Sequence, residues 1–225
     1  MKQQEIVKMF DDIAPTYDFV NKLVSFGIDK KWREEGIKKV FDFITPKKVL
    51  DVACGTGDMI EIWKTYGVDI CGIDPSKGML EVARKRFNDV KFYQSYATQM
   101  PIENHCADSI SISFGIRNVL DIQKAINEFY RVLNDNGIVL IIEFVKPQKS
   151  TVFRKAVDFY SNKILPKIGG FVSKNKQAYQ YLPASIQHFY TLEELTSLFE
   201  KNNFILKYKK TYNFGQVAII ILQKR

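Results

Sequence analysis

The sequence predicts an α/β fold in which helices cover a doubly wound sheet of seven strands, with helices before the sheet and a helical insertion before its last two strands. Short apolar runs alternate with helical stretches from residue 49 onward, and a glycine turn follows the first run. A basic, aromatic stretch interrupts this alternation at residues 146–190. Apolar runs of four to seven residues are typical of parallel strands that are buried on both faces.

The chain has 225 residues, of which 46% are hydrophobic, and this is enough for one buried core. We therefore expect a single domain over residues 1–225. The three cysteines show no Cys-x-x-Cys spacing, which favours a reducing compartment and excludes a zinc knuckle. The sequence shows neither a run of about 18 apolar residues nor a signal-peptide start, so we expect a cytoplasmic protein.

The first 45 residues are predicted to form helices that act as a lid. One apolar stripe recurs at helical spacing until Pro15 interrupts it, and it consists of Ile6, Val7, Phe10 and Ile13. A second helix is expected over about residues 30–43. It should end before Pro46, because the residue that precedes a proline disfavours helical geometry.

Seven strands are expected in two groups. The apolar runs predict parallel strands at residues 49–53, 70–74, 90–93, 109–114 and 138–144. After the insertion at 146–190, Thr191 and Glu194 form a capping box, which predicts a helix that ends near Lys201. Strands at 204–212 and 216–222 are joined by Asn-Phe-Gly, a connector short enough for a hairpin.

The strongest chemical feature is the run Val-Leu-Asp-Val-Ala-Cys-Gly-Thr-Gly-Asp at residues 49–58. Gly55 and Gly57 let the backbone approach a ligand at the end of the sheet where such folds bind ligands. Asp51 and Asp58 flank this turn, and Asp74 ends the second predicted strand, where a carboxylate can accept both hydroxyls of a ribose. For Asp58, complementing the dipole of the following helix is an alternative role.

The acids around the glycine turn favour one nucleotide ligand over another. Two carboxylates would repel the pyrophosphate of a dinucleotide, whereas they would attract an ammonium and a sulfonium. The third glycine of the dinucleotide fingerprint is also replaced, by Asp58. We therefore expect S-adenosyl-L-methionine (SAM) rather than NAD.

Four further stretches carry a family resemblance. They are residues 17–27 with Trp32, 113–119 (Ser-Phe-Gly-Ile-Arg-Asn-Val), 131–133 (Arg-Val-Leu) and 179–186 (Tyr-Gln-Tyr-Leu-Pro-Ala-Ser-Ile). The glycine turn and its acids make residues 45–225 similar to the class I SAM-dependent methyltransferases, which have a Rossmann-like sheet, and the four stretches carry a closer match. Over nearly its whole length the chain resembles the menaquinone/ubiquinone biosynthesis C-methyltransferase family.

The resemblance implies an activity and a cofactor site. Enzymes of that family methylate a ring carbon of a polyprenylated quinol, which implies conversion of demethylmenaquinol to menaquinol here and leaves a benzoquinol acceptor open. We expect SAM as the methyl donor and no metal. Position 96 is a tyrosine where the family mostly has a small polar or acidic residue. The expected cofactor-binding residues are Asp51, Gly55, Thr56, Gly57, Asp74, Tyr96, Ala97 and Ser113.

Arg117 and Asn118 are the expected catalytic residues, because they follow the fourth strand at the edge where donor and acceptor meet. Removal of a phenolic proton activates a quinol ring, and Arg117 is suited to stabilise the phenolate or to orient a water that takes the proton. An ordinary ion pair is the alternative for Arg117. Tyr17, Asn21 and Tyr181 are expected to bind the substrate, with helix packing as the alternative for Tyr17 and Asn21.

The charge is distributed unevenly along the chain. The net charge is +8, yet residues 146–225 hold 14 Lys and Arg against 4 Asp and Glu, and residues 1–145 are close to neutral. This asymmetry predicts an anionic partner. Because removing a polyprenyl tail from a bilayer costs about 0.8 kcal/mol per CH₂, we expect contact with an anionic membrane surface at the inner face of the membrane, through the insertion at 146–190, and no nucleic acid.

Several alternatives stay open from the sequence. A nucleic-acid methyltransferase would explain the basic segment, although the Asn/Asp-Pro-Pro-aromatic motif and the Pro-Cys nucleophile of such enzymes do not occur. A small-molecule O- or N-methyltransferase would keep the core without needing the four stretches. A non-catalytic module that binds SAM or a quinone is a third alternative, and a homodimer is left open.

Overall fold

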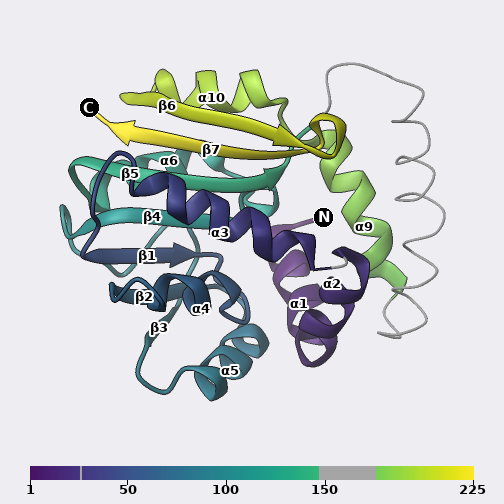
Figure 1. The fold of residues 1–225 in the computed structure, drawn as a ribbon. Helices are drawn as coiled ribbons and strands as arrows, with labels where there is room; N and C mark the ends of the chain where they lie inside the picture. Colours follow the sequence, from purple (N-terminus) through teal and green to yellow (C-terminus); the bar gives the residue numbers. More distant parts are fainter. Residues whose placement is uncertain (26, 147–175) are drawn as a thin grey trace.

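The computed structural model describes residues 1–25, 27–146 and 176–225, and its centre is a seven-stranded sheet (Figure 1). The strand order is β3-β2-β1-β4-β5-β7-β6. The first five strands pair in parallel, whereas β7 is antiparallel to both β5 and β6. The strands are β1 (Lys48–Val52), β2 (Asp69–Asp74), β3 (Lys91–Gln94), β4 (Ala107–Ser113), β5 (Leu133–Phe144), β6 (Phe204–Tyr212) and β7 (Val217–Lys224).

The predicted strands are confirmed, with their ends shifted by one or two residues in most cases. The largest difference is in β5, which begins at Leu133 rather than at residue 138. Leu133 pairs with Ala107, and the ladder then shifts register before Ile138 pairs with Ser109. Asn136 has a positive φ of 62° within this interruption. The run Asn-Asp-Asn-Gly at 134–137, which precedes the predicted strand, is therefore an irregularity inside β5.

The terminal hairpin is also confirmed, and the structure shows where it lies. A short 3₁₀ turn, η4 (Asn213–Gly215), connects β6 and β7, so that Tyr212 pairs with Val217. The hairpin extends the sheet beyond β5, and β6 forms one edge.

Both faces of the sheet are covered by helices, as the continuous apolar runs predict. On β5, Val139 and Ile141 pack with α6 (Ile122–Val132) and α10 (Leu192–Glu200), while Ile138, Leu140 and Ile142 pack with α3 (Ile28–Val40) and α4 (Asp58–Lys64). Successive side chains of a strand point to opposite faces, so one apolar run supplies two cores. The α10 helix begins with the predicted capping box between Thr191 and Glu194.

Helix α5 (Lys77–Arg86) connects β2 to β3 and packs against both strands. The remaining described helices gather at the carboxyl ends of the parallel strands (Figure 1). They are α1 (Gln3–Ile13), η1 (Ala14–Thr16), α2 (Tyr17–Ser25), η2 (Ile116–Asn118) and α9 (Lys176–His188). Pro15 interrupts the first helix as predicted. Of the expected insertion, residues 176–188 are helical, and residues 147–175 lie outside the described residues. The arrangement places helices over the edge of the sheet where a ligand is expected.

Candidate active site

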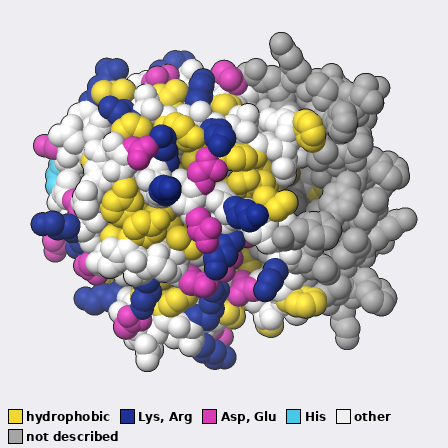
Figure 2. Space-filling model, in the orientation of Figure 1, with side chains coloured by type: hydrophobic (Ala, Val, Ile, Leu, Met, Phe, Trp, Pro, Cys, Tyr) yellow, Lys and Arg dark blue, Asp and Glu magenta, His cyan; other side chains and the backbone are white. Residues whose placement is uncertain are grey.

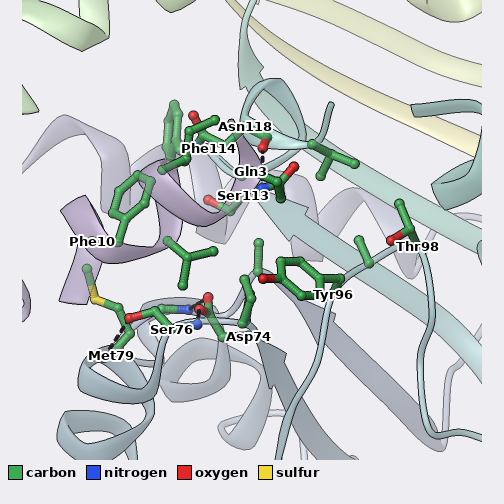
Figure 3. A pocket seen from close by; sticks show the side chains of 18 of the residues that line it. Gln3, Phe10, Asp74, Ser76, Met79, Tyr96, Thr98, Ser113, Phe114 and Asn118 are labelled. Carbon is green, nitrogen blue, oxygen red and sulfur yellow. Dashed lines mark hydrogen bonds between the residues drawn. The ribbon is translucent and has the colours of Figure 1, made fainter. Parts of the chain in front are cut away.

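A pocket lies between α1 and the carboxyl ends of β1, β2 and β4, and it is called the central pocket below (Figure 3). Figure 3 shows Phe10 on one side of the cavity and Tyr96 and Thr98 on the other, with Asp74 at the bottom of the view and Ser113 and Asn118 at the top. The lining residues are Gln3, Ile6, Val7, Phe10, Tyr17, Ala53, Gly55, Asp74, Pro75, Ser76, Met79, Tyr96, Ala97, Thr98, Ser113, Phe114, Gly115, Asn118 and Val119.

The glycine turn forms part of the floor of the central pocket. Gly55 and Gly57 have positive φ angles of 55° and 95°, a conformation that residues with a Cβ rarely adopt. A Cβ added at Gly57 would also lie 2.6 Å from the Phe87 ring, whereas at Gly55 it would meet no described atom within 4 Å. The backbone at Gly55 is therefore open to a ligand, and Gly57 supports the turn from behind.

Asp74 ends β2 inside the central pocket, and the backbone holds its carboxylate in place. The amide of Gly55 donates to Oδ2 at 2.9 Å, and the amide of Ser76 donates to Oδ1 at 2.8 Å. Burial raises the pKa of Asp74 to about 6, although these two amide donors oppose the shift. Each oxygen keeps a lone pair, so the carboxylate can still accept two hydrogen bonds, as recognition of a ribose diol requires.

Asp51 lies beneath the glycine turn and does not line the central pocket. Trp63 donates to the Ser111 hydroxyl at 3.1 Å, and this hydroxyl donates to Asp51 Oδ1 at 2.7 Å. The other carboxylate oxygen, Oδ2, has no hydrogen-bond partner among the described residues. Burial raises the pKa of Asp51 to about 7. A cationic ligand near the turn would stabilise this buried carboxylate, so the acids of the site fit SAM.

Helix α1 closes the central pocket and is hydrogen-bonded at both ends. The side-chain Nε2 of Gln3 donates to the backbone carbonyl of Asn118 at 3.0 Å, and its Oε1 accepts from the backbone amide of Leu120 at 3.1 Å. At the other end, Asp11 accepts from the Ser76 hydroxyl at 2.6 Å and from the Gly78 amide at 2.8 Å. The sequence indicates the apolar stripe of this helix but carries no signal for these two polar contacts.

A buried ion pair holds Arg117 at the end of β4. Arg117 Nη1 donates to Glu143 Oε1 at 2.7 Å, and the Arg117 amide donates to Oε2 at 3.2 Å. The Glu143 side chain is fully buried and that of Arg117 is only 7% exposed. Burial raises the pKa of Glu143, whereas Arg117 and two amide donors lower it. Sequence analysis missed Glu143, although an acid inside a buried apolar strand is itself a signal of a partner.

A second cavity, called the lateral cavity below, lies on the other side of Ile6 and Val119, which line both cavities. Arg117 and Tyr181 line it, and the Tyr181 hydroxyl donates to Asn118 Oδ1 at 3.1 Å. The other lining residues are Met1, Leu120, Ile122, Ala184, Ser185, His188, Phe189 and Tyr190.

A third cavity, called the polar cavity, lies behind the glycine turn and is lined by Asp18 and Asn21. The Thr56 hydroxyl donates to Asp18 Oδ1 at 2.5 Å, so the Thr56 side chain faces α2 and does not line the central pocket. Asn21 lies within hydrogen-bonding reach of Tyr17, whose phenol has a pKa raised by burial. Two of the expected site residues therefore lie near the pocket without lining it.

Arg33 is a further residue that sequence analysis missed. Its Nε donates to the Ser113 hydroxyl at 3.1 Å, and its guanidinium also contacts Asp29 and lies 3.7 Å from Asp58. It is buried and lies over the Phe114 ring. Arg33 therefore orients Ser113 and neutralises part of the acidic surroundings of the turn.

The structure brings seven of the expected residues together in the central pocket: Tyr17, Gly55, Asp74, Tyr96, Ala97, Ser113 and Asn118. The others lie around it: Thr56 and Gly57 belong to the turn and Asp51 lies beneath it, Arg117 and Tyr181 line the lateral cavity, and Asn21 lines the polar cavity. Within the described residues there is no group of three or more His, Cys, Asp or Glu side chains that could hold a metal ion. No helix among residues 1–25, 27–146 and 176–225 is long and apolar enough to cross a membrane.

Comparison with known proteins gives a consistent result. Residues 1–224 match the ubiE/COQ5 methyltransferase family. The ubiquinone/menaquinone biosynthesis C-methyltransferase UbiE of Campylobacter jejuni is 44% identical and aligns with 99% of this chain and 99% of its own length. The demethylmenaquinone methyltransferase of Thermus thermophilus is 36% identical and aligns with 94% of this chain and 97% of its own length.

Solved structures share the fold. A SAM-dependent methyltransferase of Thermotoga maritima superposes with a TM-score of 0.62 at 21% identity, covering 93% of this chain and 98% of that one. A protein of Methanococcus maripaludis, also described as SAM-dependent, gives a TM-score of 0.63 at 20% identity and covers 96% of this chain and 94% of that one. The expected fold class is confirmed.

Proposed function

The chain belongs to the ubiE/COQ5 methyltransferase family, and on that premise we infer that it is a SAM-dependent C-methyltransferase of quinone biosynthesis. The Campylobacter jejuni relative is named a C-methyltransferase and the Thermus thermophilus relative a demethylmenaquinone methyltransferase, which does not favour O- or N-methylation of a small molecule. We propose demethylmenaquinol as the acceptor, with a benzoquinol as a second one. The observation that carries this proposal is the position of the Arg117–Asn118 pair beside a pocket whose acids suit SAM.

Residues of the central pocket are proposed to bind SAM. When bound, SAM supplies a methyl group on a sulfonium, which an electron-rich ring carbon can attack. Asp74 would accept the ribose hydroxyls through the lone pairs that Gly55 and Ser76 leave unused. Asp51, which is buried next to the turn, would stabilise the cationic end through its negative charge. Thr56 and Gly57 shape the turn, while Gly55, Ser113, Tyr96 and Ala97 form walls around the ligand.

Arg117 and Asn118 are proposed to activate the acceptor. A quinol carbon becomes nucleophilic when its phenolic proton leaves, and a guanidinium stabilises the phenolate that results. Because Arg117 stays protonated, the proton passes to a water that Arg117 and Asn118 orient. Glu143 fixes both the backbone and the side chain of Arg117, so the guanidinium is preorganised. Tyr17 and Tyr181 contribute hydroxyls to the two cavities that flank this pair.

The chain is proposed to work as one domain with a lid. Helix α1 covers the central pocket through Ile6, Val7 and Phe10, and Gln3 and Asp11 hold it closed. The buried residues Met9 and Ile13 of α1 pack with Met79 in a cluster separate from the two cores of the sheet, so α1 can open without disturbing those cores.

A labelled-methyl assay tests the proposed function. Incubation with methyl-labelled SAM and either demethylmenaquinol or the demethylated benzoquinol should place label in the extracted lipid. The label should lie on a ring carbon and survive acid that cleaves an aryl methyl ether. A reaction without acceptor is the control. An extract without labelled quinol for both acceptors would overturn the proposal.

We propose further that the protein visits an anionic membrane surface. The support is the basic excess of residues 146–225, where a lipid-soluble substrate is expected to enter. On the face shown in Figure 2, Lys and Arg alternate with Asp and Glu, so the coloured part of that face offers no surface of one sign. Co-sedimentation should rise with phosphatidylglycerol in vesicles and fall with salt. Equal binding to phosphatidylcholine vesicles would contradict this.

A further inference from the structure

We propose that the lateral cavity binds the isoprenoid tail of the quinol whose ring reacts beside Arg117 and Asn118, an inference that rests on the proposed function. The cavity has a volume of about 670 Å³, within the range of ligand sites in proteins. Its position next to the central pocket makes it the continuation of the acceptor site, because Ile6 and Val119 are walls of both cavities.

The inner end of the lateral cavity is polar. Arg117 lines it with a side chain that is more than nine-tenths buried, and its Nε has no hydrogen-bond partner among the described residues. The positive charge of the Arg117 guanidinium at this end favours a ligand that presents an oxygen there, as a quinol ring does. Tyr181, on the facing helix α9, bonds Asn118 at the same end.

The outer end is apolar and reaches the surface. Ile122 and Phe189 are buried in the wall. Met1, Leu120 and Tyr190 line the same cavity but are 51%, 60% and 39% exposed, so they mark its mouth. Large apolar side chains gathered at the mouth of a cavity indicate an apolar ligand that passes between them.

The lining of the lateral cavity changes from polar at Arg117 to apolar at Leu120, and a prenylated quinol has the same two parts, a polar ring and an apolar tail. The ring carries the polar oxygens and must lie next to the methyl donor, while the tail is purely hydrocarbon. Each CH₂ that moves from water to an apolar wall can improve affinity by up to about fourfold. The tail should therefore contribute to substrate selection through this cavity, at residues remote from the reacting carbon.

Tail-length selectivity tests the inference. The wild type should prefer a demethylated naphthoquinol with one prenyl group over the tail-less naphthoquinol by at least about tenfold in kcat/KM. Ala184→Trp places a large side chain in the cavity from α9 and should reduce this ratio toward one. Leu120→Asp should reduce it by placing a charge at the mouth. Gln187→Trp, at an exposed α9 position away from the cavity lining, is the matched control and should keep the wild-type ratio.

A binding measurement separates this inference from the proposed function. Equilibrium dialysis of the prenylated quinone product requires no turnover, and Ala184→Trp should weaken its binding at least about tenfold relative to Gln187→Trp. The tail site would be overturned if Ala184→Trp and Leu120→Asp both kept the wild-type ratio of kcat/KM values and the wild-type affinity for the prenylated quinone, even if methyl transfer itself is normal. Failure of methyl transfer by the wild type would instead overturn the proposed function, and the dialysis result would still decide the tail site.

Discussion

Arg117→Ala is expected to lower kcat for methyl transfer by about 10²–10³-fold, which is the usual cost of losing one donor to a developing oxyanion. Its Kd for SAM should stay within about threefold of wild type, because Arg117 does not line the central pocket. Single-turnover kinetics and calorimetric SAM titration measure the two quantities separately. Arg84→Ala removes an exposed arginine of α5 and serves as the matched control.

Folding must be separated from chemistry in this experiment. Arg117→Ala leaves the Glu143 carboxylate buried without its partner, a change that commonly costs about 3–5 kcal/mol of unfolding free energy. The double variant Arg117→Met, Glu143→Leu replaces the pair by apolar groups, and we expect it to recover most of that stability. It should nevertheless remain as slow as Arg117→Ala. Recovery of methyl transfer in the double variant would show that Arg117 has only a structural role.

Asp74→Ala is expected to raise the Kd for SAM by at least about 100-fold. The ribose would lose two hydrogen bonds to a charged acceptor, each of which contributes about 1.5–3 kcal/mol. Asp74→Asn should bind SAM nearly as weakly as Asp74→Ala, because the NH₂ group of the asparagine would face one of the backbone amide donors of Gly55 and Ser76. Glu81→Ala, on the exposed part of α5, is the control. A Kd for Asp74→Ala within fivefold of wild type would place the ribose elsewhere.

The pH dependence of SAM binding gives the same residue a second test. Asp74 has a pKa of about 6 in the protein without ligand, so its ionised form prevails above that pH and its protonated form below. Because the ribose requires the ionised form as acceptor, SAM affinity should fall as the pH is lowered through about 6. Asp74→Asn should lose this component, while any change near pH 7 that arises from Asp51 should persist. An unchanged pH profile in Asp74→Asn would contradict the assignment.

Much of the fold follows from local patterns. The apolar runs, the proline at 15 and the capping box at Thr191 each lie within a short window, and the structure confirms the elements they predict. The ends of β5 were less predictable, because a register shift against β4 allows a strand to continue through a sequence that resembles a turn.

The site divides in the same way. The glycine turn, Asp74 and the residues after β4 could be found from the sequence, because parallel strands bring their carboxyl ends to one edge. Glu143 and Arg33 were missed, since each matters through a partner that is distant in the sequence. Glu143 binds Arg117 across 26 positions, and Arg33 binds Ser113 across 80.

The succession of strands and helices, the edge of the sheet where a ligand is expected and the acids around the glycine turn all follow from the sequence, because periodicity and turn chemistry act between near neighbours. The closure of the pocket by α1, the ion pair that holds Arg117 to Glu143 and the second cavity beyond Val119 become visible only in the folded chain. Gln3 and Asn118 are 115 positions apart, and only the fold brings them to 3.0 Å. Contacts of this length depend on packing the whole sheet, which no local pattern records.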